Sequence, residues 1–279
     1  MIHKAKKSLG QNFLKSETAL RKIVEAGEIK KSDVILEIGP GKGALTKKLL
    51  EKSENVIAVE KDHELFEFLK EKFAKEISEK KLILINDDIL KFSISEELQK
   101  FFSGPRFSGS LSRPDHSKNL EALRYKIIAN IPYNITGAIL KKFLTAKKQP
   151  EGMILMVQHE VAKRIMARDS KESILSISVK AYGEPKMIMK VDKRYFSPSP
   201  KVDSAVIAIK NISRETFIKN KINEERFWEI VKAGFAHKRK KLSNNLSKIC
   251  QSKALADFAN KRAENLSLTD WVLLTKSLT

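Results

Sequence analysis

An amide, a proline and an aromatic ring stand together in Asn130-Ile131-Pro132-Tyr133, directly after the apolar run 125–129. Proline removes a backbone N–H and biases the residue before it toward extended geometry. Nearby carbonyl groups, the Asn130 amide and the Tyr133 ring could therefore face one small volume. A flat group with an amino substituent would suit that volume, because carbonyl oxygens accept from the amine while the ring stacks on its face. A strand-to-helix turn with Tyr133 in the core explains these four residues equally well.

Three further positions could bind a nucleoside. Gly39-Pro40-Gly41-Lys42-Gly43 follows the apolar run 34–38, and glycines let the backbone approach a ligand closely. Glu60 ends the next apolar run, where an acid can accept two hydrogen bonds from a ribose diol. Asp88 ends the third run and could accept from an adenine amine. Each acid alone is more often a solvated strand end, but three strand ends together outline a nucleoside site.

Two kinds of cofactor fit these positions. Gly39, Gly41 and Ala44 satisfy the dinucleotide fingerprint, which makes a nicotinamide dehydrogenase an alternative. The amide-proline-tyrosine cluster and a net charge of +20 argue against it, as does the lack of an obvious proton-transfer residue paired with a substrate pocket. S-adenosylmethionine carries no pyrophosphate and is the better candidate. Its sulfonium cation would favour the nearby carboxylates of Glu37, Glu60, Asp87 and Asp88.

The elements that must position these residues alternate between strand and helix. Short β-branched runs predict strands, and apolar residues at helical spacing predict helices between them. Such alternation predicts an α/β fold, a doubly wound, mostly parallel sheet covered by helices on both faces. The seven predicted strands are 34–38, 56–59, 82–85, 125–129, 153–157, 186–191 and 204–209, and the predicted helices are 17–26, a helix starting at 44, 62–75, 136–145, 160–167 and 173–182.

Two regions depart from the alternation. Residues 101–123 contain glycine, proline and several serines without a periodic apolar face, which predicts a surface insertion loop. From residue 211 onward the spacing is helical and the charge basic, which predicts a small helical C-terminal domain. We therefore expect a first domain over 1–210 and a second over 211–279.

Composition restricts the partners and the compartment. The chain has 279 residues with 54 Lys+Arg against 34 Asp+Glu, and this excess predicts a polyanionic partner, nucleic acid ahead of a membrane surface. The alternative is an ordinary solvated surface, although basic clusters such as 237–241 argue against it. No apolar run approaches the ~20 residues that span a bilayer. A single cysteine, Cys250, fits a reducing compartment, and the histidines lack metal-ligand spacing. We expect a cytoplasmic protein without a metal.

Nearly the whole chain resembles the rRNA adenine N6-dimethyltransferases, and within them the small-subunit enzymes of the kasugamycin-sensitivity type. Single motifs are modestly specific, whereas all of them in order are strongly specific. Besides Glu60 and Asp88, the resemblance rests on Gly10-Gln11-Asn12-Phe13-Leu14, Glu37-Ile38-Gly39-Pro40-Gly41, Asn130-Ile131-Pro132-Tyr133, the run from Phe196 to Val206, the run from Phe235 to Leu242 and Arg262-Ala263-Glu264-Asn265-Leu266-Ser267. The stretch 101–123 is longer than the family pattern.

The resemblance implies a class I, Rossmann-like methyltransferase fold and a role for each matching residue. S-adenosylmethionine would be bound around Asn12, Leu14, Gly39, Gly41, Glu60, Asp88 and Asn130. Asn130, Pro132, Tyr133 and Phe196 would form the catalytic group, with Tyr133 and Phe196 on the two faces of a flipped base. The substrate would be two adjacent adenosines near the 3′ end of 16S rRNA in an assembling 30S particle, methylated by a monomer.

Two other functions remain possible at this point. The sister enzymes of the macrolide-resistance type methylate large-subunit rRNA and share the Asn-Ile-Pro-Tyr motif. The run 198–206 and the segment 262–267 favour the small-subunit type. The chain could also be a noncatalytic rRNA-binding assembly factor or a mitochondrial-type transcription factor on the same scaffold. Intact Glu60, Asp88, Asn130 and Tyr133 argue against that function.

Overall fold

The computed structural model describes residues 5–103, 124–167, 169, 171–247, 249 and 257–278. The predicted insertion loop 101–123 lies mostly outside these residues. Its first three positions are the exception, because helix α5 (Ile94–Ser103) continues to Ser103. Cys250 also lies outside the described residues. No helix in the described ranges is long and apolar enough to cross a membrane.

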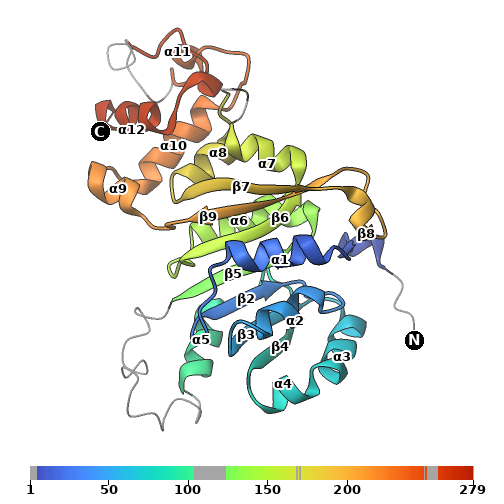
Figure 1. The fold of residues 1–279 in the computed structure, drawn as a ribbon. Helices are drawn as coiled ribbons and strands as arrows, with labels where there is room; N and C mark the ends of the chain where they lie inside the picture. Colours follow the sequence, from blue (N-terminus) through green and yellow to red (C-terminus); the bar gives the residue numbers. More distant parts are fainter. Residues whose placement is uncertain are drawn as a thin grey trace.

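The centre of the molecule is a seven-stranded sheet in the order β4-β3-β2-β5-β6-β9-β7 (Figure 1). All neighbouring pairs from β4 to β6 are parallel, and β9 runs antiparallel to both β6 and β7. The predicted doubly wound, mostly parallel sheet is confirmed. Its strands are β2 (Val34–Ile38), β3 (Asn55–Glu60), β4 (Leu82–Asn86), β5 (Tyr125–Asn130), β6 (Gly152–Gln158), β7 (Glu184–Val191) and β9 (Ser204–Lys210).

The chain order creates a switch point between β2 and β5. From β2 the chain proceeds outward through β3 to β4, then returns to form β5 on the other side of β2. Ligands of open α/β sheets bind outside the carboxyl ends of the strands at such a point. The glycine turn that follows β2 and the Asn130 segment that ends β5 therefore lie at the same edge of the sheet.

Alternate residues of the central strands pack into two separate hydrophobic clusters, one on each face. In β2, Leu36 and Ile38 belong to one cluster and Ile35 to the other, as expected for strands buried on both sides. The second cluster contains buried residues of α1, α2 and α3, whereas the first contains those of α6, α7 and α8. The bounds are α1 (Glu17–Ala26), α2 (Ala44–Leu50), α3 (His63–Lys72), α4 (Ala74–Ser78), α6 (Thr136–Leu144), α7 (His159–Met166) and α8 (Ile174–Lys180).

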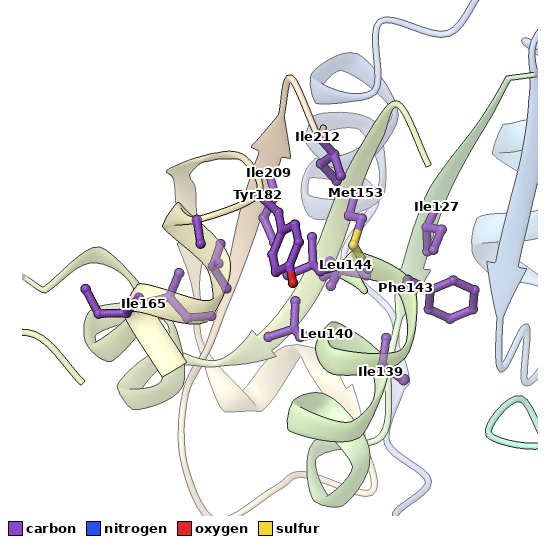
Figure 2. Packing of buried hydrophobic residues seen from close by; sticks show 14 of the residues in the cluster. Ile127, Ile139, Leu140, Phe143, Leu144, Met153, Ile165, Tyr182, Ile209 and Ile212 are labelled. Carbon is purple, nitrogen blue, oxygen red and sulfur yellow. The ribbon is translucent and has the colours of Figure 1, made fainter. Parts of the chain in front are cut away.

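The C-terminal segment folds into helices beside the β7 edge of the sheet (Figure 1). Their apolar residues, Trp271 and Phe227 among them, belong to the same cluster as the sheet residue Ile209. Figure 2 shows Tyr182 and Ile209 gathered with side chains of α6, β5 and β6. The division into domains 1–210 and 211–279 stays a prediction. The helices are α9 (Glu215–Asn220), α10 (Glu224–Gly234), α11 (Leu242–Asn245) and α12 (Leu268–Ser277).

The predicted helix 62–75 is in fact two helices, α3 and α4, which meet at Phe73. Phe73 leaves helical geometry with φ −112° and ψ 27°, and its side chain is 4% exposed. A Cβ added to Gly43 would lie 2.5 Å from the Phe73 ring, so this ring packs directly against the glycine turn. The helix is interrupted where an aromatic side chain supports the predicted binding site.

Candidate active site

A cavity of about 540 Å³ lies at the switch-point edge of the sheet, within the range of about 300–1,000 Å³ usual for small-molecule sites. It is bounded by the turn after β2, the ends of β3 and β5, the loop after β4 and the N-terminal arm, residues 8–15. Nine of the ten predicted site residues line it together: Asn12, Leu14, Gly39, Gly41, Glu60, Asp88, Asn130, Pro132 and Tyr133.

The turn after β2 needs glycine for its backbone conformation. Gly39, Gly41 and Gly43 have φ values of +64°, +59° and +75°, the left-handed region that side chains disfavour. A Cβ on Gly41 would also lie 3.0 Å from the Phe13 ring. The Gly39 N–H donates to the Val59 carbonyl at 2.9 Å and so ties the turn to β3. The turn is thus held open toward the cavity and has no side chain of its own at these positions.

The carboxylate of Glu60 is fixed in place by backbone groups. Its two oxygens accept from the Gly41 N–H at 3.0 Å and from the Asp62 N–H at 2.9 Å. The side chain is 6% exposed, and this burial raises the pKa of Glu60 although the two backbone hydrogen bonds oppose the shift. Each oxygen keeps a second lone pair, so a rigid acceptor faces the cavity.

Glu37 is a site residue for which the sequence pattern predicted no individual role. It lies within β2, is 1% exposed and lines the cavity. Burial raises the pKa of Glu37 to about 8, and the nearby charge of Glu60 contributes in the same direction. Among the described residues its Oε2 has no hydrogen-bond partner. The signal in the sequence is a single acid inside an otherwise apolar strand.

Asp88 lies in the loop after β4 at the far side of the cavity. Its carboxylate forms an ion pair with Lys61 at 2.8 Å and accepts the Leu90 N–H at 3.0 Å. The hydrogen bond from Lys61 lowers the pKa of Asp88, which is therefore ionised at neutral pH. The Lys142 ammonium donates to the carbonyls of Leu90 and Phe92 at 2.9 and 2.7 Å, which anchors the same loop to α6.

The N-terminal arm lines the cavity and, together with Lys6 just before it, is attached to the start of α3. The Lys6 ammonium lies 2.7 Å from one Asp62 oxygen, and the Gln11 amide donates to the other at 2.7 Å. Farther along, β1 (Phe13–Leu14) pairs antiparallel with β8 (Phe196–Ser197), beside the arm in Figure 1. These contacts explain how Asn12 and Leu14, distant in sequence from the sheet motifs, reach the cavity.

The Asn130 amide and the Tyr133 ring are both held by hydrogen bonds. Asn130 Nδ2 donates to the Asn12 carbonyl at 3.1 Å, which leaves Oδ1 as an acceptor. The Tyr133 hydroxyl lies 2.5 Å from the Ser204 hydroxyl of β9, and Ser204 is fully buried. Burial raises the pKa of Tyr133, so the hydroxyl stays protonated. The sequence contained Ser204 in a matching motif but no spacing that would connect it with Tyr133.

Phe196 is the one predicted site residue that does not line the cavity. It is 2% exposed and packs in the same cluster as Leu14 and Leu20, while its neighbour Ser197 does line the cavity. Pairing of β8 with the arm places the Phe196 side chain in the core. Its role on the second face of the base stays a prediction.

No cluster of three or more metal-ligating side chains occurs among the residues that the structure describes. The cavity is lined by carboxylates, backbone groups, amide side chains and the rings of Phe13 and Tyr133. A doubly wound sheet with a nucleoside-sized cavity at its switch point has the architecture of a Rossmann-like methyltransferase.

The family is shown by comparison with known proteins. The model of the ribosomal RNA adenine dimethylase family matches residues 2–279. A ribosomal RNA small subunit methyltransferase A of Dehalococcoides mccartyi is 39% identical over 277 residues, 96% of this chain and 86% of the relative. The protein of that name from Fusobacterium nucleatum is 36% identical and covers 99% of this chain and 98% of its own length. The chain belongs to the ribosomal RNA adenine dimethylase family.

Solved structures agree with this fold. A dimethyladenosine transferase from Plasmodium falciparum superposes with a TM-score of 0.73 at 25% identity, covering 94% of this chain and 95% of that one. The 23S rRNA methyltransferase ErmE superposes with a TM-score of 0.71 at 23% identity, covering 96% of this chain and 99% of that one. At this identity the second likeness concerns the fold alone.

Proposed function

We propose that the chain transfers methyl groups from S-adenosylmethionine to the N6 amines of two adjacent adenosines near the 3′ end of 16S rRNA, during assembly of the 30S subunit. Family membership and the names of the similar curated proteins support the small-subunit substrate. The observation that carries the chemistry is the Asn130 amide, which is oriented by the Asn12 carbonyl at the edge of the cavity.

The residues around the cavity fit S-adenosylmethionine. The fixed Glu60 carboxylate suits a ribose diol, and Asp88 suits an adenine amine. Glu37 lines the cavity with a buried oxygen that has no partner among the described residues, and a cationic ligand there would favour the ionised form of this acid. When bound, the cofactor supplies an electrophilic methyl group on a sulfonium. The chain's task is then to bind the cofactor and orient the acceptor.

The acceptor amine is a weak nucleophile because its lone pair is delocalised into the adenine ring. Asn130 Oδ1 accepts one amine hydrogen, and a backbone carbonyl accepts the other. We assign this second acceptor to Ile131, because the Pro132 carbonyl already receives the Ile135 N–H at 3.3 Å. Two such bonds favour the pyramidal amine, whose lone pair is free to attack. Tyr133 stacks on the base and holds it in line, so orientation provides most of the acceleration.

Positive charge outside the cavity supports an RNA substrate. The segment 237–241 after α10 is exposed throughout and contains His237, Lys238, Arg239, Lys240 and Lys241. Such a cluster neutralises phosphates and gives binding that weakens as salt rises. The monomeric state and the cytoplasmic location stay predictions from the sequence.

The proposed function is tested by incubating the protein with unmethylated small subunits, large subunits and labelled S-adenosylmethionine, then mapping modified adenosines by mass spectrometry. We expect dimethylation of two adjacent adenosines in the small-subunit RNA. Label confined to large-subunit RNA would instead identify the macrolide-resistance type of activity. A protein that binds small subunits but transfers no label would be a noncatalytic assembly factor.

A further inference from the structure

A second cavity of about 420 Å³ adjoins the cofactor cavity. Both cavities are lined by Gly10, Asn12, Tyr133 and Asn134, so these four residues lie at the junction between them. The carboxylates Glu37, Glu60 and Asp88 line the first cavity and not the second. The second cavity therefore lies on the side of Tyr133 that is away from the nucleoside-binding groups.

Gln158 lines only the second cavity. It is the last residue of β6, at the same edge of the sheet as Asn130 at the end of β5. In the β6–β9 register it is paired with Ser204, whose hydroxyl holds the Tyr133 hydroxyl at 2.5 Å. Its half-buried amide forms no side-chain hydrogen bond within the described part of the chain. Its donor and acceptor are therefore available to a ligand in the second cavity.

The chemistry of an amide beside Tyr133 suits one edge of adenine. The amine hydrogens are already assigned to Asn130 and the Ile131 carbonyl, which leaves the ring nitrogen N1 next to the amine as an acceptor. An amide N–H can donate to this nitrogen. Guanine carries a hydrogen at N1, so the same orientation of the amide would place two donors against each other. Lys7, exposed on the rim of the same cavity, offers a positive charge to the phosphate of the same nucleotide.

We propose that Gln158 is a specificity-determining residue that donates its amide N–H to N1 of the acceptor adenine in this second cavity. The inference rests on the proposed function, because it names a further contact to the same acceptor. It assigns Gln158 no part in binding the cofactor, since its side chain lines only the other cavity.

Two variants and one matched control separate this contact from a general effect. Gln158→Leu removes the amide at similar size, and Gln158→Glu keeps an acceptor but loses the donor. Gln99→Leu makes the same change at an exposed position of α5, away from both cavities. We expect both Gln158 variants to lower the single-turnover methylation rate on small subunits by about tenfold, the value of one hydrogen bond. Gln99→Leu should match the wild type, and all four proteins should bind S-adenosylmethionine equally.

Substrate analogues identify the atom that is contacted. Small subunits carrying 1-deazaadenosine at the target lack N1, and those carrying 7-deazaadenosine retain it. We expect the wild type to methylate the 1-deaza substrate about tenfold more slowly than the natural one. Gln158→Leu should show no such decrease, because the variant already lacks the bond to N1. On the second analogue the variant should keep its full defect.

Two results would overturn the role of Gln158 while leaving the proposed function intact. One is an active wild type whose Gln158 variants match Gln99→Leu. The other is a Gln158→Leu defect that persists in full on the 1-deaza substrate. A wild type that methylates no adenosine in either subunit would instead overturn the proposed function, and the acceptor contact with it.

Discussion

Replacing Glu37 with Gln should make the protein more stable above neutral pH while weakening its cofactor binding. Glu37 is 1% exposed with a pKa of about 8, against an ordinary value of 4.5. Between these values the folded chain binds a proton that the unfolded chain has lost, so the free energy of unfolding falls as pH rises. The difference of 3.5 pKa units, at about 1.4 kcal/mol each, sets a ceiling of about 5 kcal/mol on this loss by pH 8.

The assay is urea unfolding of the wild type and Glu37→Gln at pH 5, 6, 7 and 8. Glutamine imitates the protonated acid, so the variant should match the wild type near pH 5 and exceed it by about 2–5 kcal/mol at pH 8. Glu71→Gln, an exposed change in α3, should show no such trend. Isothermal titration at pH 8, where Glu37 ionises, should show weaker binding of S-adenosylmethionine by Glu37→Gln, because glutamine cannot carry the charge that attracts the sulfonium. A stability difference that stays constant from pH 5 to pH 8 would refute the assignment of a buried, protonated Glu37.

Four further changes test the supports of the site. Ser204→Ala removes the partner 2.5 Å from the Tyr133 hydroxyl and should slow single-turnover methylation by about three- to tenfold without changing cofactor affinity. Tyr133→Phe should cause a similar loss, and additive losses in the double variant would contradict a shared bond. Asp62→Asn weakens the attachment of the arm and should speed the release of the cofactor measured by stopped-flow. An unchanged release rate would contradict the idea that the attached arm helps to retain the cofactor. Gly43→Ala places a Cβ 2.5 Å from the Phe73 ring at φ +75° and should lower the free energy of unfolding by about 2–4 kcal/mol in urea titration, and a change below about 0.5 kcal/mol would contradict the packing argument.

The sheet and much of the cavity could be predicted because their signals are local. Short β-branched runs marked the strands, and Gly39, Glu60, Asp88 and Asn130 each follow or end such a run. Parallel strands bring their carboxyl ends to one edge, so residues at those ends meet without further information. The break at Phe73 could not be predicted, because it depends on packing against Gly43, 30 positions away.

Contacts made by the arm were harder to predict. Asn12 and Leu14 were predicted to lie in the site only through the family resemblance, since nothing in their spacing connects them with β5. In the structure, Asn12 orients Asn130 through its backbone carbonyl, which any residue type could provide. A contact of this kind has no side-chain signature, so it follows only from the pairing of β1 with β8.

The antiparallel strand β9 explains why Ser204 could not be assigned to the site from the sequence pattern. In an all-parallel sheet the first residue of a strand lies at the edge opposite the carboxyl ends, far from the site. Because β9 runs the other way, its first residue, Ser204, lies beside the last residue of β6, Gln158. The segment before β9 thereby reaches the cavity edge, where β8 pairs with the arm. One reversed strand thus brings the support of Tyr133, and the strand that pairs with the N-terminal arm, to the same edge as Asn130 and Gln158.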